Sequence, residues 1–440
     1  MDDLRALLVT YVFPPTGGAG VGRVLKLAKY LGHHGVTPSV LTVANPSVPL
    51  RDESLLRDVP AGMDVIRART LEPGYGVKKA AWTASANADP NKAAKPSLKG
   101  RAVALARQVL IPDPQVLWQP GAQLALARRM RSPQADDLVF ISAPPFSELL
   151  LGPTVRAFRG KALVLDYRDE WSTLRDSYEM VKGGLAARVG EPLERVLLRR
   201  AHAVTTATEA FRRNLLDRFS FLRPERVFAI PNGYDRDDFA GDLPKPSGDK
   251  LTLTYAGTIF RLTSARGLLG AIKRLHRDSP NLARLLHVQF LGRIVETELD
   301  AFEGTEALGV ERLGYVSHER VIGELSRSHA VLCLLDDVPG VERIYPAKIF
   351  ELMAMERPCF TLAPPGALTE LVEAHGLGTI LPPRDEAAIA RALAELLTAF
   401  RDGRPLPTPA PRGIERFDRK NLAGEYAEVF RSAVRWAREP

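Results

Sequence analysis

The sequence predicts an α/β protein made of two Rossmann-like domains, each a doubly wound sheet of mostly parallel strands. The chain has 440 residues, more than one compact core usually holds. Strand-like and helical patterns alternate along almost all of it. The same strand–loop–helix opening begins near residue 5 and again at residue 251. We therefore expect two facing domains, with ligand bound in the cleft at the carboxyl ends of the strands.

The first domain is predicted to span residues 1–236. It opens with a strand at Arg5–Tyr11 and a glycine-rich loop, followed by a helix with apolar residues spaced from Val21 to Leu31. Residues 74–131 are expected to form an insertion, because their first part is rich in Ala, Lys, Gly and Pro and has weak periodicity. The further strands expected are Ser39–Val43, Leu138–Ser142, Ala162–Asp166 and Ala203–Thr206.

The second domain is predicted to span residues 237–411, entered through a polar, turn-rich linker at Phe239–Lys250. A strand at Leu251–Ala256 and a helix at Ala265–Leu275 repeat the opening of the first domain. Residues 412–440 carry an amphipathic helix that we expect to cross back to the first domain. The further strands expected are Leu286–Gly292, Val331–Leu335, Cys359–Leu362 and Thr379–Leu381.

Composition indicates an ordinary globular protein, 45% hydrophobic and 25% charged. The two cysteines, Cys333 and Cys359, lie in strand-like runs, which favours buried free thiols in a reducing compartment. We expect no signal peptide, since Pro14 and Pro15 interrupt the first apolar run, and no segment approaches the length of a spanning helix. The expected location is cytoplasmic.

The net charge is +8, with conspicuous basic density between residues 78 and 131. This density is either a solvated face or a patch that meets anionic lipid at the inner membrane surface or an anionic acceptor. No nucleic-acid-binding motif accompanies it, so a nucleic acid partner is not expected. The basic residues are Lys78, Lys79, Lys92, Lys95, Lys99, Arg101, Arg107, Arg128, Arg129 and Arg131.

The most informative stretch is residues 345–351, which follows an apolar strand and a loop that contains Gly and Pro. Pro346 suits the first position of a helix. Lys348 and Glu351 then share the face nearest the helix N-terminus, where a cation suits a phosphate and a carboxylate can accept two ribose hydroxyls. The alternative is a surface ion pair between residues three apart.

Other loops at strand ends carry candidate binding residues. Gly17 and Gly18 precede the first helix and can hold an anion on backbone amides. No complete GxGxxG with an acidic partner and no GxxxxGK[ST] is present, which disfavours a dinucleotide oxidoreductase. Arg261 and Arg266 follow the first strand of the second half and can converge with Lys348 on a diphosphate, or else face solvent.

The segment from Asp166 to Trp171 follows a strand and so falls at the cleft edge. Acidic groups there can polarise an acceptor hydroxyl or steady a positive sugar ring. Alternatively, Arg168 and Asp169 form a structural ion pair above Trp171.

Asp235 follows a tight turn and is better explained as a turn or cap residue than as a metal ligand. No HExxH motif or CxxC pair is present, so no metal site is expected.

These residues give the chain a resemblance to bacterial glycosyltransferases of the GT-B fold, in the retaining group called family 4. The resemblance covers nearly the whole chain. Six motifs in the family's order carry it: Phe13-Pro14-Pro15-x-Gly17-Gly18-x-Gly20, Asp166-x-Arg168-Asp169-x-Trp171, Pro231-Asn232-Gly233-Tyr234, Tyr255-Ala256-Gly257-Thr258, Gly314-Tyr315-Val316 and Pro346-Ala347-Lys348-Ile349-Phe350-Glu351.

The resemblance implies a nucleotide-diphospho-sugar donor, of UDP or GDP type, bound mainly by the second domain, and an acceptor on the first, where residues 74–131 are expected to contact it. It implies that Gly18 reaches over the diphosphate and that Arg261, Arg266 and Lys348 hold it. The base is implied to pack near Gly314 and Val316, with the ribose on Glu351. No cofactor is implied.

Two positions depart from the family pattern. The usual Glu-x7-Glu ends at Glu351, but its first position is Arg343, with Glu342 one place early, so their contacts to the donor sugar are open. Many relatives also have a His after the strand that ends at Ser142 here, and this chain has none in residues 143–148.

The sequence hypothesis is therefore metal-independent transfer of a sugar to a hydroxyl acceptor (a glycan, glycolipid or small metabolite) with retention of configuration. Catalysis would come from positioning and from cations that neutralise the leaving diphosphate, with Asp169 and Arg168 near the reacting centre. Two alternatives stay open: a sugar-nucleotide epimerase of similar fold, and a degenerate, non-catalytic glycosyltransferase that serves as a partner protein.

Overall fold

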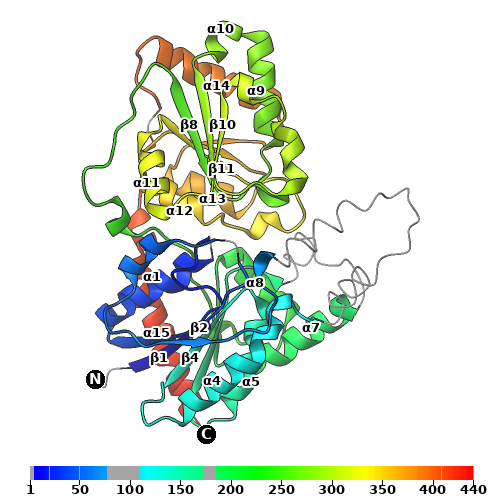
Figure 1. Ribbon diagram of the computed structural model, residues 1–440, viewed down its shortest axis with the longest axis vertical. Helices are drawn as coiled ribbons and strands as arrows, with labels where there is room; N and C mark the ends of the chain where they lie inside the picture. The colour runs from blue at the N-terminus through cyan, green and yellow to red at the C-terminus, as the bar shows by residue number, and fades with distance from the viewer. Residues whose placement is uncertain are drawn as a thin grey trace. The chain divides into compact units, whose positions relative to one another are not determined.

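The computed structural model describes residues 4–18, 20–48, 50–76, 110–171, 185–407 and 409–439. Contacts divide the chain into two compact units (Figure 1). Unit 1 comprises Met1–Ile230 and Ala423–Pro440, and unit 2 comprises Pro231–Leu422. The sequence placed the corresponding boundaries after residues 236 and 411. In both descriptions the end of the chain groups with the N-terminal part.

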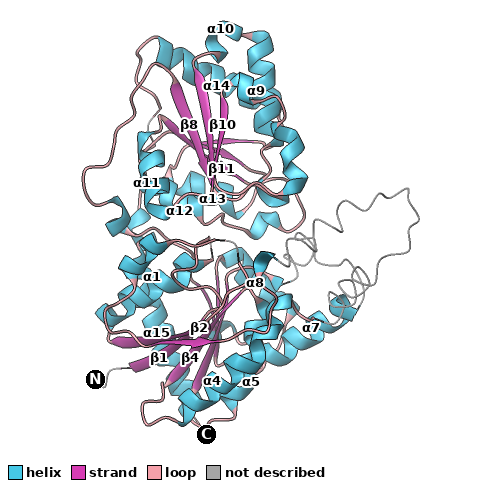
Figure 2. Cartoon of the chain, in the orientation of Figure 1, coloured by secondary structure: helices cyan, strands magenta, loops and turns pink. Residues whose placement is uncertain are grey.

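Unit 1 contains a seven-stranded sheet in the order β3-β2-β1-β4-β5-β6-β7, and every neighbouring pair is parallel. Helices lie on both faces (Figure 2), so the central strands are buried on both sides and read as continuous apolar runs. The strands are β1 (Leu4–Val9), β2 (Val36–Val43), β3 (Val65–Ala68), β4 (Leu138–Ala143), β5 (Ala162–Tyr167), β6 (Ala203–Thr206) and β7 (Val227–Ala229). The helices are α1 (Val21–Leu31), α4 (Gln119–Arg131), α5 (Gly152–Arg156), α7 (Leu185–Leu198), α8 (Glu209–Arg218) and α15 (Arg419–Arg438), the last of which belongs to unit 1 from Ala423 onward.

Unit 2 contains a six-stranded parallel sheet in the order β10-β9-β8-β11-β12-β13. Two apolar clusters form its core. The strands are β8 (Leu251–Ala256), β9 (Leu286–Leu291), β10 (Val310–Gly314), β11 (Ala330–Leu334), β12 (Cys359–Leu362) and β13 (Thr379–Leu381). The helices are α9 (Arg266–Asp278), α10 (Pro280–Ala283), α11 (His318–Arg327), α12 (Lys348–Ala354), α13 (Ala367–His375) and α14 (Glu386–Arg401).

All strands named from the sequence are present, but the sequence missed three: β3, β7 and β10. Each is an outermost strand of its sheet, hydrogen-bonded on one side only and partly exposed. An edge strand needs no continuous apolar run, which weakens the signal that revealed the inner strands, although the fourth edge strand, β13, was predicted.

The start of α12 also differs from the prediction. The helix begins at Lys348 rather than at Pro346. Pro346 instead forms a preceding turn, in which its carbonyl accepts the N–H of Ile349 at 3.0 Å. Proline is still placed where its missing N–H costs no helical bond.

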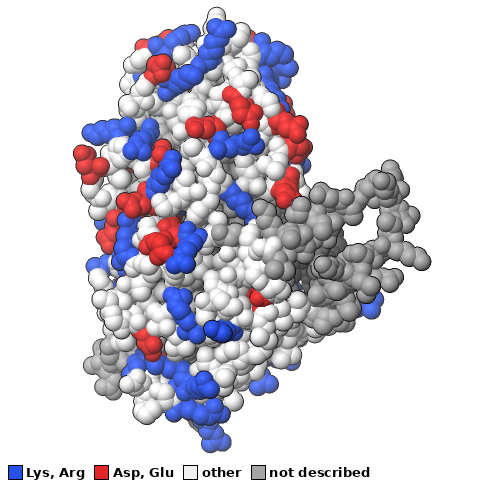
Figure 3. All heavy atoms as spheres, viewed as in Figure 1, with Lys and Arg blue, Asp and Glu red and all other residues white. Residues whose placement is uncertain are grey.

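The expectations about the cysteines, the basic residues and membrane-spanning segments have mixed outcomes. Cys333 and Cys359 are buried free thiols on neighbouring strands, as predicted. Arg129 does not belong to a basic patch, because it is buried and paired with Asp136 and Asp64. On the face shown in Figure 3, Lys and Arg side chains are interspersed with Asp and Glu. Residues 78–109, with most of the predicted basic density, lie outside the described residues. Within the described residues, no helix has the length and apolarity that crossing a bilayer requires.

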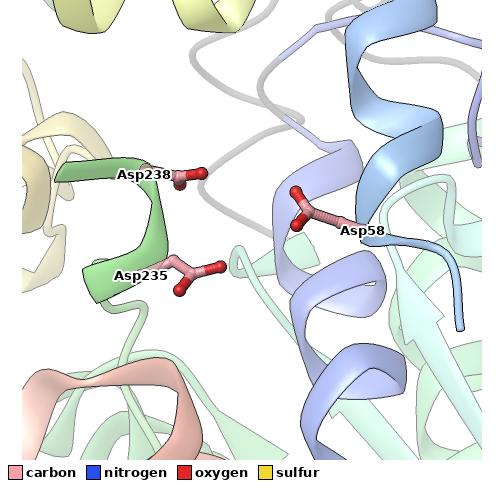
Figure 4. Close-up of side chains that lie close together, drawn as sticks. All are labelled: Asp58, Asp235 and Asp238. Carbon is pink, nitrogen blue, oxygen red and sulfur yellow. The ribbon is translucent and has the colours of Figure 1, made fainter. Parts of the chain in front are cut away.

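The acidic residues after the turn at residues 231–234 have structural roles. The Asp235 carboxylate accepts the N–H of Asp237 at 3.0 Å and caps the short helix η6 (Arg236–Phe239). Figure 4 shows the Asp235 and Asp238 side chains. Asp58 of unit 1, drawn in the same figure, pairs with Lys26 at 2.8 Å and Lys29 at 2.9 Å. The cap interpretation of Asp235 is confirmed.

Candidate functional site

The candidate donor site is built on three side chains of unit 2. Lys348 begins α12, just after β11, and its Nζ lies 2.8 Å from Oε2 of Glu351. The other carboxylate oxygen of Glu351 lies 3.4 Å from Nε2 of His318. His318 begins α11, just after β10, so carboxyl ends of two separate strands contribute to one cluster. The predicted Lys348–Glu351 proximity is confirmed, and the two side chains form the ion pair that the sequence analysis gave as the alternative.

The cluster keeps Glu351 ionised. Burial alone raises the pKa of Glu351, but the Lys348 charge and the His318 contact outweigh it and hold that pKa well below its ordinary value. An ionised carboxylate accepts hydrogen bonds through both oxygens and donates none. Glu351 is therefore suited to bind a pair of hydroxyl groups, in competition with Lys348 and His318.

His318 was missed by the sequence analysis. It stands two residues after Val316, at the first position of an amphipathic helix whose N-cap is Ser317. A polar residue at the carboxyl end of a strand, in the same loop as Gly314 and Val316, was the available signal.

The two predicted arginines differ in their contacts. Arg261 begins the short helix η7 (Arg261–Thr263) and is exposed; in the part of the chain that the structure describes, its guanidinium forms no ion pair. Arg266 instead pairs with Asp300 at 2.6 Å and Glu298 at 3.4 Å. These contacts do not favour the predicted phosphate role of Arg266, because its charge is already balanced. No contact among the described residues joins either arginine to Lys348.

The remaining predicted donor residues surround the strand ends. Gly314 has φ +67°, and its carbonyl accepts the N–H of Gly292 at 2.7 Å. Val316 is half-buried against the core of unit 2. Glu342 and Arg343 form an ion pair with each other, which occupies both of the side chains predicted to meet the donor sugar.

In unit 1 the glycine-rich loop is already partly bonded. The Gly17 N–H donates to the Leu50 carbonyl at 3.1 Å, so this amide is not available to an anion. Gly18 has φ +108°, a conformation that favours glycine, and its carbonyl accepts the N–H of Val21 at 3.2 Å. The prediction that the Gly17 amide binds phosphate is therefore wrong, because that N–H is already hydrogen-bonded to Leu50.

Arg168 is a positioning residue in this structure. Its two terminal nitrogens donate to the carbonyl oxygens of Gly20 and Pro144, which tie the glycine-rich loop to the loop after β4. It forms no ion pair with Asp169, so the alternative of a structural Arg168–Asp169 ion pair is wrong. Trp171 stacks on Phe146, with ring centroids 4.8 Å apart.

The carboxylate of Asp169, the other predicted catalytic residue, has no hydrogen-bond donor among the described residues. The residue is half-buried. Burial raises the pKa of Asp169, and the nearby charges of Arg168 and Arg23 offset this only in part. A carboxyl with a raised pKa at the end of a strand is suited to proton transfer.

Glu148 is a second carboxyl that the sequence analysis did not single out. It is fully buried; Oε1 accepts the N–H of Tyr11 at 2.8 Å, and Oε2 has no partner among the described residues. Burial raises the pKa of Glu148 well above its ordinary value, despite the charge of Arg168. The available signal was an acid inside the apolar run at residues 146–151.

We expect Glu148→Gln to stabilise the protein at neutral pH. A carboxyl whose pKa is raised on folding binds more protons in the folded state, so it destabilises that state increasingly as pH rises above its unfolded pKa. Glutamine keeps the acceptor for Tyr11 and cannot ionise. Thermal unfolding should show a Tm about 2–4 °C higher at pH 8, corresponding to about 1 kcal/mol, and no gain at pH 4. An equal gain at both pH values would contradict the ionisation argument.

Comparison with solved structures shows the fold class of this protein. A sucrose-phosphate synthase from Thermosynechococcus elongatus matches at a TM-score of 0.64 with 15% identity, over 97% of this chain and 98% of that one. HepE from Anabaena, solved with UDP and glucose, matches at 0.56 with 15% identity, over 97% and 95%. The two parallel-sheet units and these matches show the GT-B fold of glycosyltransferases.

Family comparison then places the chain within that class. Residues 17–233 match the glycosyl transferase 4-like domain, and residues 250–399 match the domain of glycosyl transferases group 1. The chain belongs to the group 1 glycosyltransferases and is a glycosyltransferase. A comparison with curated proteins gave no match. The predicted family, fold and enzyme class are confirmed.

Proposed function

We propose that this protein transfers a sugar from a nucleotide-diphospho-sugar to a hydroxyl group of an acceptor, with retention of configuration and without a metal ion. The observation that carries the proposal is the Lys348–Glu351–His318 cluster at the strand ends of unit 2, in a chain of the glycosyltransferase family. HepE and an E. coli trehalose-6-phosphate protein with 13% identity and a TM-score of 0.57 were solved with UDP and with UDP-2-fluoro glucose.

The cluster suits the two ends of a nucleoside diphosphate. Lys348 would bind the diphosphate and leave Oε2 of Glu351, which would then accept ribose hydroxyls while His318 holds the other oxygen. Lys348 and His318 lower the pKa of Glu351, and after Lys348 leaves, His318 and the incoming hydroxyl donors would still favour the ionised carboxylate. Arg261, exposed and unpaired among the described residues, is the second candidate cation for the diphosphate.

We assign acceptor binding to unit 1, around Asp169. Its carboxylate would accept a hydrogen bond from the attacking hydroxyl or steady the positive charge that develops on the sugar ring. The departing diphosphate would take the acceptor proton on the same face of the sugar, which gives retention. Cations at the diphosphate would stabilise the leaving group and supply most of the rate enhancement.

We expect Lys348→Ala to lower kcat/KM for the donor by about 10- to 100-fold or more, because it removes a charged hydrogen bond to the leaving group. Donor hydrolysis and transfer are measured with UDP- and GDP-sugars, and nucleotide binding with thermal shift. Lys273→Ala removes an exposed lysine of α9 and is the matched control.

Three outcomes test the proposal. Unchanged turnover in a folded Lys348→Ala protein would reject the phosphate role. Inversion of the anomeric centre in the product, read by NMR, would reject retention, and loss of activity with EDTA would reject metal independence. Nucleotide binding without turnover of any donor, or rearrangement of donor without acceptor, would support the non-catalytic or epimerase alternatives.

A further inference from the structure

Unit 2 has an open cavity at the edge of its sheet opposite the candidate donor site. Its volume is about 820 Å³, within the range typical of small-molecule sites. It lies where β11 and β12 begin, whereas Lys348 and His318 stand where strands end. Residues 239–246 form one wall, in the segment that runs along unit 2 before β8 begins (Figure 1).

Two residues that line this cavity, Arg357 and His329, are half-buried, and each has a hydrogen-bond donor without an acceptor among the described residues. Arg357 donates through Nη2 to the Ser326 carbonyl at 3.1 Å, but its buried Nε has no partner among the described residues. His329 accepts the N–H of Thr252 on Nδ1 at 3.1 Å, so its proton is on Nε2. Burial lowers the pKa of His329, with a further contribution from Arg357, which keeps the ring neutral. Within the described residues, Nε2 of His329 also lacks a partner.

The rim of the cavity carries side chains of both positive and negative charge. Lys245 is exposed and lines this cavity and the adjoining one, of about 550 Å³, which also includes Arg327. Asp242 and Glu356 are the exposed carboxylates of the rim. The guanidinium of Arg357, the N–H of His329 and a lysine suit a phosphate group, and exposed carboxylates suit hydroxyl groups.

Glu356 also has an unusual backbone. Its φ is +52°, and it is the one non-glycine residue with positive φ among the described residues. It follows the end of α12, where glycine is the usual choice. A side chain in this conformation costs about 1–2 kcal/mol, and such strain is concentrated at ligand and active sites.

We propose that this cavity, defined by Lys245, His329, Glu356 and Arg357, binds a small organic phosphate that bears hydroxyl groups. The phosphate contacts the Arg357 guanidinium, His329 Nε2 and Lys245, and the hydroxyls donate to the rim carboxylates. The site is separate from the Lys348 cluster and does not depend on the proposed donor chemistry.

Isothermal titration calorimetry of the full chain with glucose 6-phosphate, in a phosphate-free buffer, tests this site. We expect saturable binding that is weakened about tenfold or more in Arg357→Met and in Lys245→Gln, since each removes a charged contact. Lys245 is exposed, so Lys245→Gln keeps the test valid if Arg357→Met folds poorly. Arg391→Met, an exposed arginine of α14 outside the cavity, is the control and should bind as the unmodified chain does.

The two sites are distinguished by a crossed comparison. Lys348→Ala should leave glucose 6-phosphate binding unchanged, and Arg357→Met should leave UDP or GDP binding unchanged. Absence of saturable binding, or binding that is lost in Lys348→Ala and kept in both cavity variants, would overturn the proposal. Equal affinity for inorganic phosphate and glucose 6-phosphate would overturn the assignment of an organic, hydroxyl-bearing ligand.

Discussion

Gly292→Ala is expected to destabilise unit 2 by about 3–5 kcal/mol, the range of severe core defects. Gly292 follows β9 with φ +131°, which an alanine rarely adopts. A Cβ at this position would overlap the carbonyl oxygen of Gly257, directly after β8. Both backbones are held there, since Gly257 N–H donates to Leu291 at 2.8 Å and Gly292 N–H donates to Gly314 at 2.7 Å. Neither segment can move without loss of these bonds.

Gly304→Ala is the matched control for this prediction. Gly304 also has positive φ, +70°, but no atom lies within 4 Å of the position that its Cβ would take. Alanine at position 304 would therefore lose stability only through backbone strain, by about 1–2 kcal/mol. Urea unfolding of both variants separates strain from overlap. Equal losses in the two variants would show that the close approach of Gly292 and Gly257 contributes nothing.

The Gly292 variant should also affect ligand binding. Gly257 and Gly314 flank the strand ends that carry the candidate donor site. A shift of either loop moves groups that we propose to contact a nucleotide, so nucleotide affinity should fall more in Gly292→Ala than in Gly304→Ala. Thermal shift with UDP and GDP measures this difference. If nucleotide affinity were unchanged in Gly292→Ala, the donor site would have to lie elsewhere in unit 2.

Asp166→Ala is expected to cost about 3–5 kcal/mol of the stability of unit 1, the penalty typical of a buried ion pair that loses one partner. Asp166 is fully buried and pairs with the buried Arg23 at 2.8 Å. It also accepts hydrogen bonds from Ser142 at 2.6 Å, Thr205 at 2.7 Å and Tyr426 of α15 at 3.2 Å. Alanine would leave the guanidinium and three hydroxyls without their shared acceptor.

The same network predicts a dependence on pH. Burial raises the pKa of Asp166, but Arg23 and the hydroxyl donors outweigh it and hold that pKa below its ordinary value. A carboxyl with a lowered folded pKa contributes stability above its unfolded pKa, and this contribution is lost as pH falls through the folded pKa. The difference in unfolding free energy between the original chain and Asp166→Ala should therefore shrink below about pH 4.

Tyr426→Phe is the control for Asp166→Ala, because it removes one hydrogen bond and keeps the ion pair. It should cost about 0.5–1.5 kcal/mol. Denaturant unfolding with hydrogen exchange assigns the loss to unit 1. If both variants were equally stable, the network would not depend on the charge pair.

Much of the fold was predictable because parallel sheets are covered on both faces, which leaves a continuous apolar signal in each inner strand. The strands Ala203–Thr206, Leu251–Ala256 and Cys359–Leu362 have the ends that the sequence predicted. Edge strands such as β10 carry no such signal. Within the candidate site, the Lys348–Glu351 contact was predictable because residues three apart on a helix lie next to each other.

Contacts between distant segments were not predictable. Arg266 was expected to be available for phosphate, but Asp300 lies 34 positions away and takes its charge. Arg168 was expected near the chemistry, but the carbonyls of Gly20 and Pro144 take its donors. His318 joins Glu351 across 33 positions. The apolar periodicity of the sequence does not indicate which distant residues pair.

The amino-acid sequence by itself determined the alternation of strands and helices, the two Rossmann-like units and the local pair on α12, because these follow from apolar spacing and helix geometry. Only the tertiary structure decided which polar groups are occupied. Each arginine or carboxylate has many possible partners along the chain, and the folding of loops at the strand ends selects among them. That selection separates Lys348, Glu351 and His318, which form the candidate site, from Arg266 and Gly17, whose donors the fold already uses.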